Sequence, residues 1–192
     1  MSAASNPLPK LMTVGEFLAQ DHDPTMRFEL VDGIMVAMNP PHFGHAQLVQ
    51  SIGLLLVRSL PSPCRAYWSA TGVAESDDGT TWREPDIVVS CVRPDGAYVK
   101  TPRMLVEVLS PSTEKDDRTT KLDFYETLPS LEAVLLVWQD ERRVRLRSRG
   151  AAGWVDQDVI GSGTVAIPGL GVSLSLDEIY ADPWVEAAPG EA

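Results

Sequence analysis

Short, largely apolar runs of strand-forming residues predict β-hairpins at two places in the chain. Residues 27–31 and 34–38 are rich in strand-forming residues, and Asp32-Gly33 separates them. Asp-Gly between two such runs is a strong hairpin signal, because both residues tolerate the positive φ angles of a tight turn. Residues 131–138 and 142–149 have the same character and predict a second hairpin. Single strands are expected over residues 65–75, 154–160 and 172–174.

Apolar residues at helical spacing predict two longer helices. The first covers residues 43–60, and the second covers about residues 115–128, where Pro129 stops it. The apolar stripe of the first helix consists of Leu48, Val49, Ile52, Leu55 and Leu56. A short helix is expected after Thr13, with Glu16 as its capping-box partner, and a last helical turn over residues 176–180.

Two central segments, residues 86–91 and 104–109, are almost continuously apolar, and each contains one acidic residue. Strands of this kind are usually buried on both faces, as in sheets that are covered by helices. The pattern therefore predicts an α/β fold with a mixed central β-sheet flanked by helices. One domain over residues 12–180 accounts for these elements, with tails at residues 1–11 and 181–192.

The acidic residues of these two segments are candidate metal ligands. Glu107 lies between Val106 and Val108, where an ionised carboxylate is costly unless it is paired or holds a metal. Asp86 follows Pro85 directly, a position that also commonly marks the start of a strand. Two carboxylates on adjacent strands can converge on one hard cation such as Mg²⁺. The alternative is a structural salt bridge or a strand edge that faces water.

Lys121 is the third candidate for this site. Phe124, Tyr125 and Leu128 follow it at i+3, i+4 and i+7, so Lys121 heads an apolar stripe that is expected to face the sheet. A lysine in that place must reach a carboxylate or extend its ammonium group to water. The alternative is an ion pair with Asp117, four residues earlier.

Three further features leave a structural and a functional interpretation open. His45 heads a similar apolar stripe, and a packed or capping histidine is the simpler explanation. Glu29 lies within an apolar strand, so it could join a metal site or face solvent by alternation. A run of arginines at period-two spacing forms one strand face, which predicts a solvated face and alternatively a phosphate-contacting ridge. These arginines are Arg143, Arg145, Arg147 and Arg149.

Charge argues against a generic nucleic-acid binder, because the 192-residue chain has a net charge of −11 and such proteins are usually basic. Basic and acidic residues are balanced between Arg83 and Lys121, however, so the whole excess of negative charge lies outside that stretch. Any affinity for DNA is therefore expected to be modest and sensitive to salt.

Several classes of protein are excluded by missing patterns. Cys64 and Cys91 have no CxxC spacing and no paired histidines, so neither a zinc site nor a disulfide framework is expected. The start of the chain lacks a signal-peptide pattern, and no apolar run approaches the length needed to span a bilayer, so a cytoplasmic location without membrane contact is expected. Dinucleotide-binding, phosphate-loop, zinc-protease and serine-hydrolase motifs are all lacking.

The central motifs resemble those of the Uma-type putative restriction endonuclease family, which belongs to the PD-(D/E)XK nuclease-like superfamily. The resemblance rests on Arg83-Glu-Pro-Asp86-Ile-Val-Val, on Leu105-Val-Glu107-Val-Leu-Ser110-Pro-Ser-Thr113, and on Asp117-Arg118 with Lys121 to Tyr125. Phe28-Glu29-Leu30-Val31-Asp32-Gly33 and His45 fit the N-terminal pattern of the family, and the likeness covers roughly residues 12–180.

The resemblance implies a restriction-endonuclease-like core in which Asp86 and Glu107 are the metal-binding acids. The superfamily places a lysine two residues after the second acid, where this chain has Leu109. The resemblance implies that Lys121, on the following helix, takes that role. The segment from Leu136 to Asp140 also departs from the usual Tyr-Trp-Leu-Val-Asp run, which is expected to affect packing more than chemistry.

These observations lead to the hypothesis of a metal-dependent DNA endonuclease, a hydrolase of phosphodiester bonds. Asp86 and Glu107 would hold one or two Mg²⁺ or Mn²⁺ ions, with Glu29 and the Val108 carbonyl as further ligands. Lys121 would orient the attacking water and stabilise the developing charge. A homodimer is a further expectation, since many nucleases of this fold dimerise to cut two strands. The alternative is a DNA-binding or assembly module on the same fold whose catalytic site has decayed.

Overall fold

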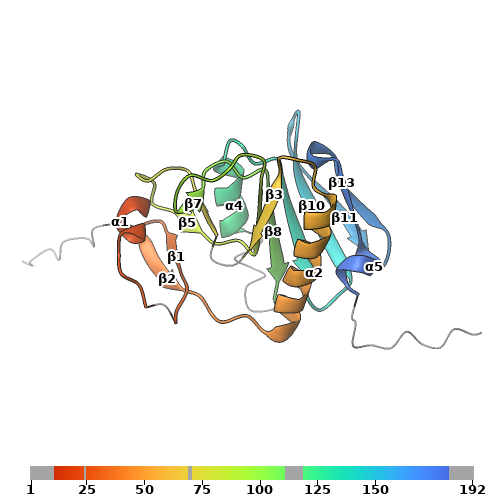
Figure 1. The fold of residues 1–192 in the computed structure, drawn as a ribbon, viewed down its shortest axis with the longest axis horizontal. Helices are drawn as coiled ribbons and strands as arrows, with labels where there is room; N and C mark the ends of the chain where they lie inside the picture. The colour runs from red at the N-terminus through yellow and green to blue at the C-terminus, as the bar shows by residue number, and fades with distance from the viewer. Residues whose placement is uncertain (1–10, 24, 69–70, 111–118, 182–192) are drawn as a thin grey trace, which may run out of the picture.

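The computed structural model describes residues 11–23, 25–68, 71–110 and 119–181, and its largest element is a six-stranded mixed sheet (Figure 1). In this large sheet β8 and β9 run parallel, and the other neighbouring strands run antiparallel. The order across the sheet is β11 (Gly153–Ile160), β10 (Arg143–Gly150), β9 (Ala133–Trp138), β8 (Met104–Leu109), β6 (Ile87–Ser90) and β3 (Arg65–Trp68). The mixed sheet confirms the predicted fold class.

A second, five-stranded sheet lies at the end of the molecule that carries α1 (Val14–Leu18) (Figure 1). The order of this small sheet is β2 (Ile34–Ala37), β1 (Phe28–Val31), β5 (Trp82–Arg83), β4 (Gly72–Ala74) and β7 (Tyr98–Val99). Val14 and Phe17 of α1 pack with Leu30 and Trp82 in a core of their own. The predicted capping box of Thr13 and Glu16 begins α1.

Helices cover both faces of the large sheet, which explains why its central strands are apolar throughout. All six residues of β8 are buried. Val106 and Val108 pack in a cluster with residues of α2 (Phe43–Ser59), whereas Leu105 and Leu109 pack with residues of α4 (Thr120–Thr127). Figure 1 shows α2 and α4 on the two sides of β8. The α2 side is completed by the hairpin of β12 (Thr164–Ile167) and β13 (Val172–Ser175), with the short helices η1 (Pro168–Leu170) and α5 (Leu176–Ile179).

The two hairpins that the sequence predicts are confirmed. β1 pairs with β2 around Asp32 and Gly33, whose φ angles are +48° and +78°. Positive φ at both central residues is the geometry that matches the twist of the flanking strands. β9 pairs with β10 in the same antiparallel manner.

The predicted strand over residues 65–75 is wrong, because two strands in two different sheets occupy this stretch. β3 pairs with β6 in the large sheet, whereas β4 pairs with β5 and β7 in the small sheet. The chain passes from one sheet to the other here, and apolar alternation does not reveal such a change of partner. Helix α4 spans Thr120–Thr127, and the predicted start near residue 115 falls outside the described residues. β5, β7 and β12 are additional strands.

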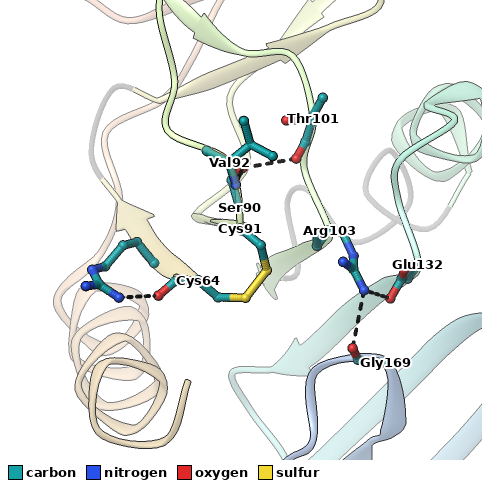
Figure 2. The surroundings of a disulfide bond; sticks show 9 residues. Cys64, Ser90, Cys91, Val92, Thr101, Arg103, Glu132 and Gly169 are labelled. Atoms are coloured by element: carbon teal, nitrogen blue, oxygen red, sulfur yellow. Dashed lines mark hydrogen bonds and ion pairs between the residues drawn. A yellow bond between two sulfur atoms is a disulfide. The ribbon is translucent and has the colours of Figure 1, made fainter. Parts of the chain in front are cut away.

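The expectation that the chain has no disulfide framework is also wrong, since Cys64 and Cys91 form a disulfide bond (Figure 2). Arg65 lies opposite Ser90 in the antiparallel pair of β3 and β6, so Cys64 and Cys91 take the next pair of facing positions. The spacing of 27 residues along the chain carries no sign of this, because the pairing follows from strand register. None of the helices in the described ranges is long and apolar enough to cross a membrane.

A thiol assay tests whether Cys64 and Cys91 are joined by a disulfide bond. Protein purified in air is expected to contain no titratable thiol, and to show two after unfolding and reduction, because the chain has two cysteines. Replacing both by serine removes a crosslink that closes a loop of this size, which lowers the free energy of unfolding by about 3–4 kcal/mol. For a domain of this length that corresponds to a melting temperature lower by on the order of 10 °C. Two free thiols before reduction would contradict the assignment.

Candidate active site

Asp86 and Glu107 face each other across two neighbouring strands of the large sheet. β6 and β8 are antiparallel with Ile87 opposite Val106, so the next pair of positions brings Asp86 opposite Glu107. Residues directly opposite in an antiparallel pair share one face, with Cβ atoms about 5 Å apart. The side chain of Glu107 is 3% exposed and that of Asp86 is 14% exposed. The two carboxylates therefore meet at the edge of the core, as the sequence predicts.

The carboxylate of Asp86 is oriented by two donors on one of its oxygens. The Val108 backbone N–H donates to Asp86 Oδ2 at 2.7 Å, and His45 Nε2 lies 3.1 Å from the same oxygen. In the described part of the chain neither contact uses Oδ1, so that oxygen is left for another ligand. His45, at the start of α2, is thus a partner of Asp86 rather than a packed residue of the helix.

The carboxylate of Glu107 is held by two residues of α4. Tyr125 donates its hydroxyl hydrogen to Glu107 Oε1 at 2.5 Å, and Lys121 Nζ lies 3.3 Å from the same oxygen. Lys121 and Tyr125 are one helical turn apart, so both side chains reach the sheet from one face of α4. Lys121 is buried, with its side chain 9% exposed. Lys121 thus reaches a carboxylate of the sheet from the head of its apolar stripe, and the alternative partner Asp117 lies outside the described residues.

Glu29 comes from the small sheet and approaches the same ammonium group. Lys121 Nζ lies 3.8 Å from Glu29 Oε1. The other oxygen of Glu29 accepts a hydrogen bond from Arg83 at 2.8 Å, and the backbone N–H of Glu84 donates to Oε1 at 2.9 Å. Glu84 in turn accepts from Arg27 at 2.5 Å. The site is therefore a charge network that extends over both sheets.

A cleft of about 390 Å³ opens onto this network. Asp86, Glu107 and Lys121 line it, together with His45 and residues of the loop that precedes α2. A second cavity of about 380 Å³ beside Tyr67 and Tyr98 has no carboxylate in its lining. The cleft is thus the cavity in which the sequence-predicted residues come together.

The donor set of the cleft fits a divalent cation that brings its own water. The described residues contain no group of three or more His, Cys, Asp or Glu side chains arranged to hold a metal. Mg²⁺ does not require such a cage, because one or two carboxylates with water and substrate phosphate complete its octahedral shell. Asp86 and Glu107 supply two such carboxylates at the edge of the cleft.

The arginine face of β10 is engaged within the protein itself. Arg143 and Arg145 bind Asp158 of β11, and Arg147 binds Asp156 and Glu126. Arg149 donates to the backbone carbonyls of Leu131, Glu126 and Leu128. Hydrogen bonds from Arg145 and then Arg143 hold the pKa of Asp158 well below its usual range. The face is a partly exposed ion-pair ladder, in which the side chains of Arg143, Arg145 and Arg147 are 21–25% exposed. The engagement of these arginines with acidic side chains argues against a phosphate-contacting ridge.

Comparison with known proteins gives the family. Residues 14–177 match the model of the Uma2 family, described as a putative restriction endonuclease. The chain belongs to the Uma2 family. This membership supports a nuclease class of function, a hydrolase at the coarse level, with nucleic acid as the class of substrate.

Two uncharacterized relatives and one solved structure extend this result. The protein slr1290 of Synechocystis sp. is 27% identical over 180 residues, covering 92% of this chain and 94% of its own length. The protein sll1609 of the same organism is 26% identical over 163 residues, covering 79% and 89%. The crystal structure of a putative nuclease belonging to DUF820 from Anabaena variabilis has the same fold, with a TM-score of 0.70 at 17% identity. It covers 88% of this chain and 98% of its own.

Sequence reasoning on this Uma2 protein missed the residues that support the site. Tyr125 was assigned to the apolar stripe, and its position four residues after Lys121 was the available signal for a shared partner. Arg83 and Glu84 gave no such signal, because their contacts with Glu29 span 54 and 55 residues.

The ion pairs of Asp158 in this ladder lead to a prediction of how the free energy of unfolding depends on pH in acid. A carboxyl whose pKa is depressed in the folded state stabilises the fold above its unfolded pKa of about 4, and this contribution declines as pH falls below that value. Asp158→Asn is expected to lower the free energy of unfolding by less than about 1 kcal/mol at pH 7, since the ladder is partly exposed. Urea unfolding from pH 7 to pH 2 should show a constant difference from wild type down to about pH 5 that narrows below pH 4. A difference that widens in acid would contradict the assignment.

Proposed function

We propose that this Uma2 protein is a DNA endonuclease that uses Mg²⁺ or Mn²⁺ to hydrolyse phosphodiester bonds. The observation that carries the proposal is the convergence of Asp86 and Glu107 on one cleft, with the Lys121 ammonium group 3.3 Å from Glu107. Two acids and one lysine in that arrangement provide a cation site and a positive charge beside it, which phosphodiester hydrolysis needs.

Each residue of the cleft has a separate part in the proposed reaction. The metal, when bound, polarises the scissile phosphate and lowers the pKa of a bound water. Asp86 and Glu107 would hold it, and the contacts of Val108 N–H and His45 with Asp86 Oδ2 would leave Oδ1 as the oxygen for the metal. Lys121 orients the attacking water and stabilises negative charge that develops on the phosphate. The proposed further ligands Glu29 and the Val108 carbonyl are not needed for this arrangement.

Binding of DNA is proposed to be weak and to depend on salt. The net charge of −11 repels phosphate, and the arginines of β10 are engaged with acidic side chains and backbone carbonyls. Arg27, whose side chain is 40% exposed, is a basic residue at the cleft. A homodimer belongs to the same proposal, because one site per copy requires two copies to cut both strands. A cytoplasmic location is proposed as well.

The second candidate is a DNA-binding or assembly module whose catalytic site has decayed. The acidic charge favours the assembly role within this candidate, because any protein that acts on or binds DNA gains affinity from basic surface. Calorimetric titration with Mn²⁺ separates the two candidates. An intact site binds Mn²⁺ and loses that binding in Glu107→Gln, whereas a decayed site gives no heat of binding in either protein.

A plasmid-nicking assay tests the proposed activity directly. With Mg²⁺ or Mn²⁺, Asp86→Asn and Lys121→Met are expected to lower the nicking rate at least about 100-fold, the size of effect seen when one group that stabilises transition-state charge is removed. The matched controls are Asp95→Asn and Lys100→Met, which change exposed residues outside the cleft and should keep the wild-type rate. Activity that survives both cleft substitutions would overturn the assignment of these residues.

A further inference from the structure

We propose that Glu29 is a positioning residue that holds the Lys121 ammonium group beside Glu107, and that it does not bind the metal. The proposal rests on the proposed function, because it gives Lys121 its place in that reaction. The proposal gives the small sheet a role in the site. Glu107 belongs to the large sheet and Asp86 directly precedes its strand β6, whereas Glu29 comes from the small sheet.

The first observation is that one ammonium group lies between two buried carboxylates. Lys121 Nζ is 3.3 Å from Glu107 Oε1 and 3.8 Å from Glu29 Oε1. The Glu29 side chain is 6% exposed and that of Glu107 is 3% exposed. An ammonium group has three donors, so it can serve both acids at once. Attraction to both carboxylates would hold the ammonium group within reach of each of them.

The second observation is that Glu29 is itself fixed, and that both of its oxygens already have donors. Arg83 donates to Oε2 at 2.8 Å and the Glu84 N–H donates to Oε1 at 2.9 Å. A carboxylate in such a setting is a fixed negative charge. Binding a metal would require it to give up these bonds and would leave the Arg83 guanidinium, which is also buried, without that anion.

Strand register explains why this arrangement forms. β1 and β5 are antiparallel with Leu30 opposite Trp82, so Glu29 lies opposite Arg83 in the next pair of positions. A cross-strand pair therefore sets the place of the Glu29 carboxylate. The small sheet reaches the site through this pair, whereas α4 brings Lys121 from the face of the large sheet.

The rival interpretation is that Glu29 only neutralises Arg83 and that its distance to Lys121 has no consequence. The two interpretations differ in what happens to Lys121 when Glu29 loses its charge. A positioning role predicts that Lys121 moves more freely and becomes accessible. A role confined to Arg83 predicts that Lys121 stays protected by Glu107 and the surrounding core.

Chemical accessibility of Lys121 tests this without relying on nuclease activity. Lys121 is one of four lysines, and exposed Lys100 is an internal standard within the same molecule. Acylation by an amine-reactive reagent, followed by peptide mass spectrometry, should show Lys121 strongly protected in wild type. In Glu29→Gln the ratio of Lys121 to Lys100 labelling is expected to rise at least about 10-fold. An unchanged ratio would overturn the proposal.

Two further variants keep this result interpretable. Glu126→Gln is the matched control, because it makes the same chemical change on α4 and breaks the ion pair with Arg147 at a distance from the cleft. Labelling of Lys121 should stay at the wild-type level there. Glu29→Asp keeps a charge for Arg83 but withdraws it from Lys121, and it should also increase labelling. It serves as the test if Glu29→Gln does not fold.

Metal binding and a double-mutant cycle complete the experiment. Glu29→Gln should leave the dissociation constant for Mn²⁺ within about twofold of wild type, and a rise of tenfold or more would show a ligand instead. In nicking assays Glu29→Gln should lower kcat about 10-fold, and it should have no further effect when Lys121 is already Met. If wild type does not nick DNA, the proposed activity fails, while the labelling and Mn²⁺ measurements still decide the role of Glu29.

Discussion

The need to compensate buried negative charge shapes the whole of this structure. Glu107 and Glu29 are both almost fully buried, and an isolated carboxylate in such a place is strongly destabilising. Lys121, Arg83 and Tyr125, which are buried as well, supply the compensating charges and the hydrogen-bond donor. None of these groups could be buried alone, so the acids and their partners stabilise the fold only as a set.

The large sheet, α4 and the small sheet all contribute side chains to this group of buried charges. The large sheet brings Glu107 and Asp86 together, α4 brings Lys121 and Tyr125 over one face, and the small sheet brings Glu29 with Arg83. The cleft at their junction has a volume of about 390 Å³. Apolar clusters on both faces of β8 hold the site in place, and among the described residues the cleft opens onto it.

Local patterns predicted the parts of this site that depend on a single element. Glu107 stood out because it interrupts an apolar strand, and Lys121 because it heads an apolar helical stripe. Such patterns could not predict partners that are set by the register between paired strands. The Glu29–Arg83 pair and the Cys64–Cys91 bond each join strands that are distant in sequence, and each follows from the pairing of neighbouring positions. The break within residues 65–75 escaped prediction for the same reason, since it is a change of sheet rather than of local pattern.

The central claim is that Asp86 and Glu107 together form a divalent-cation site. A crystal structure of the protein grown at saturating Mn²⁺, with anomalous data collected at the manganese edge, tests it most directly. The account predicts one anomalous peak in the cleft, about 2.0–2.3 Å from a carboxylate oxygen of Asp86 and of Glu107, with Glu29 still bound to Arg83. A cleft without manganese at saturation, or a manganese ion held by Glu29 in place of Asp86, would contradict it.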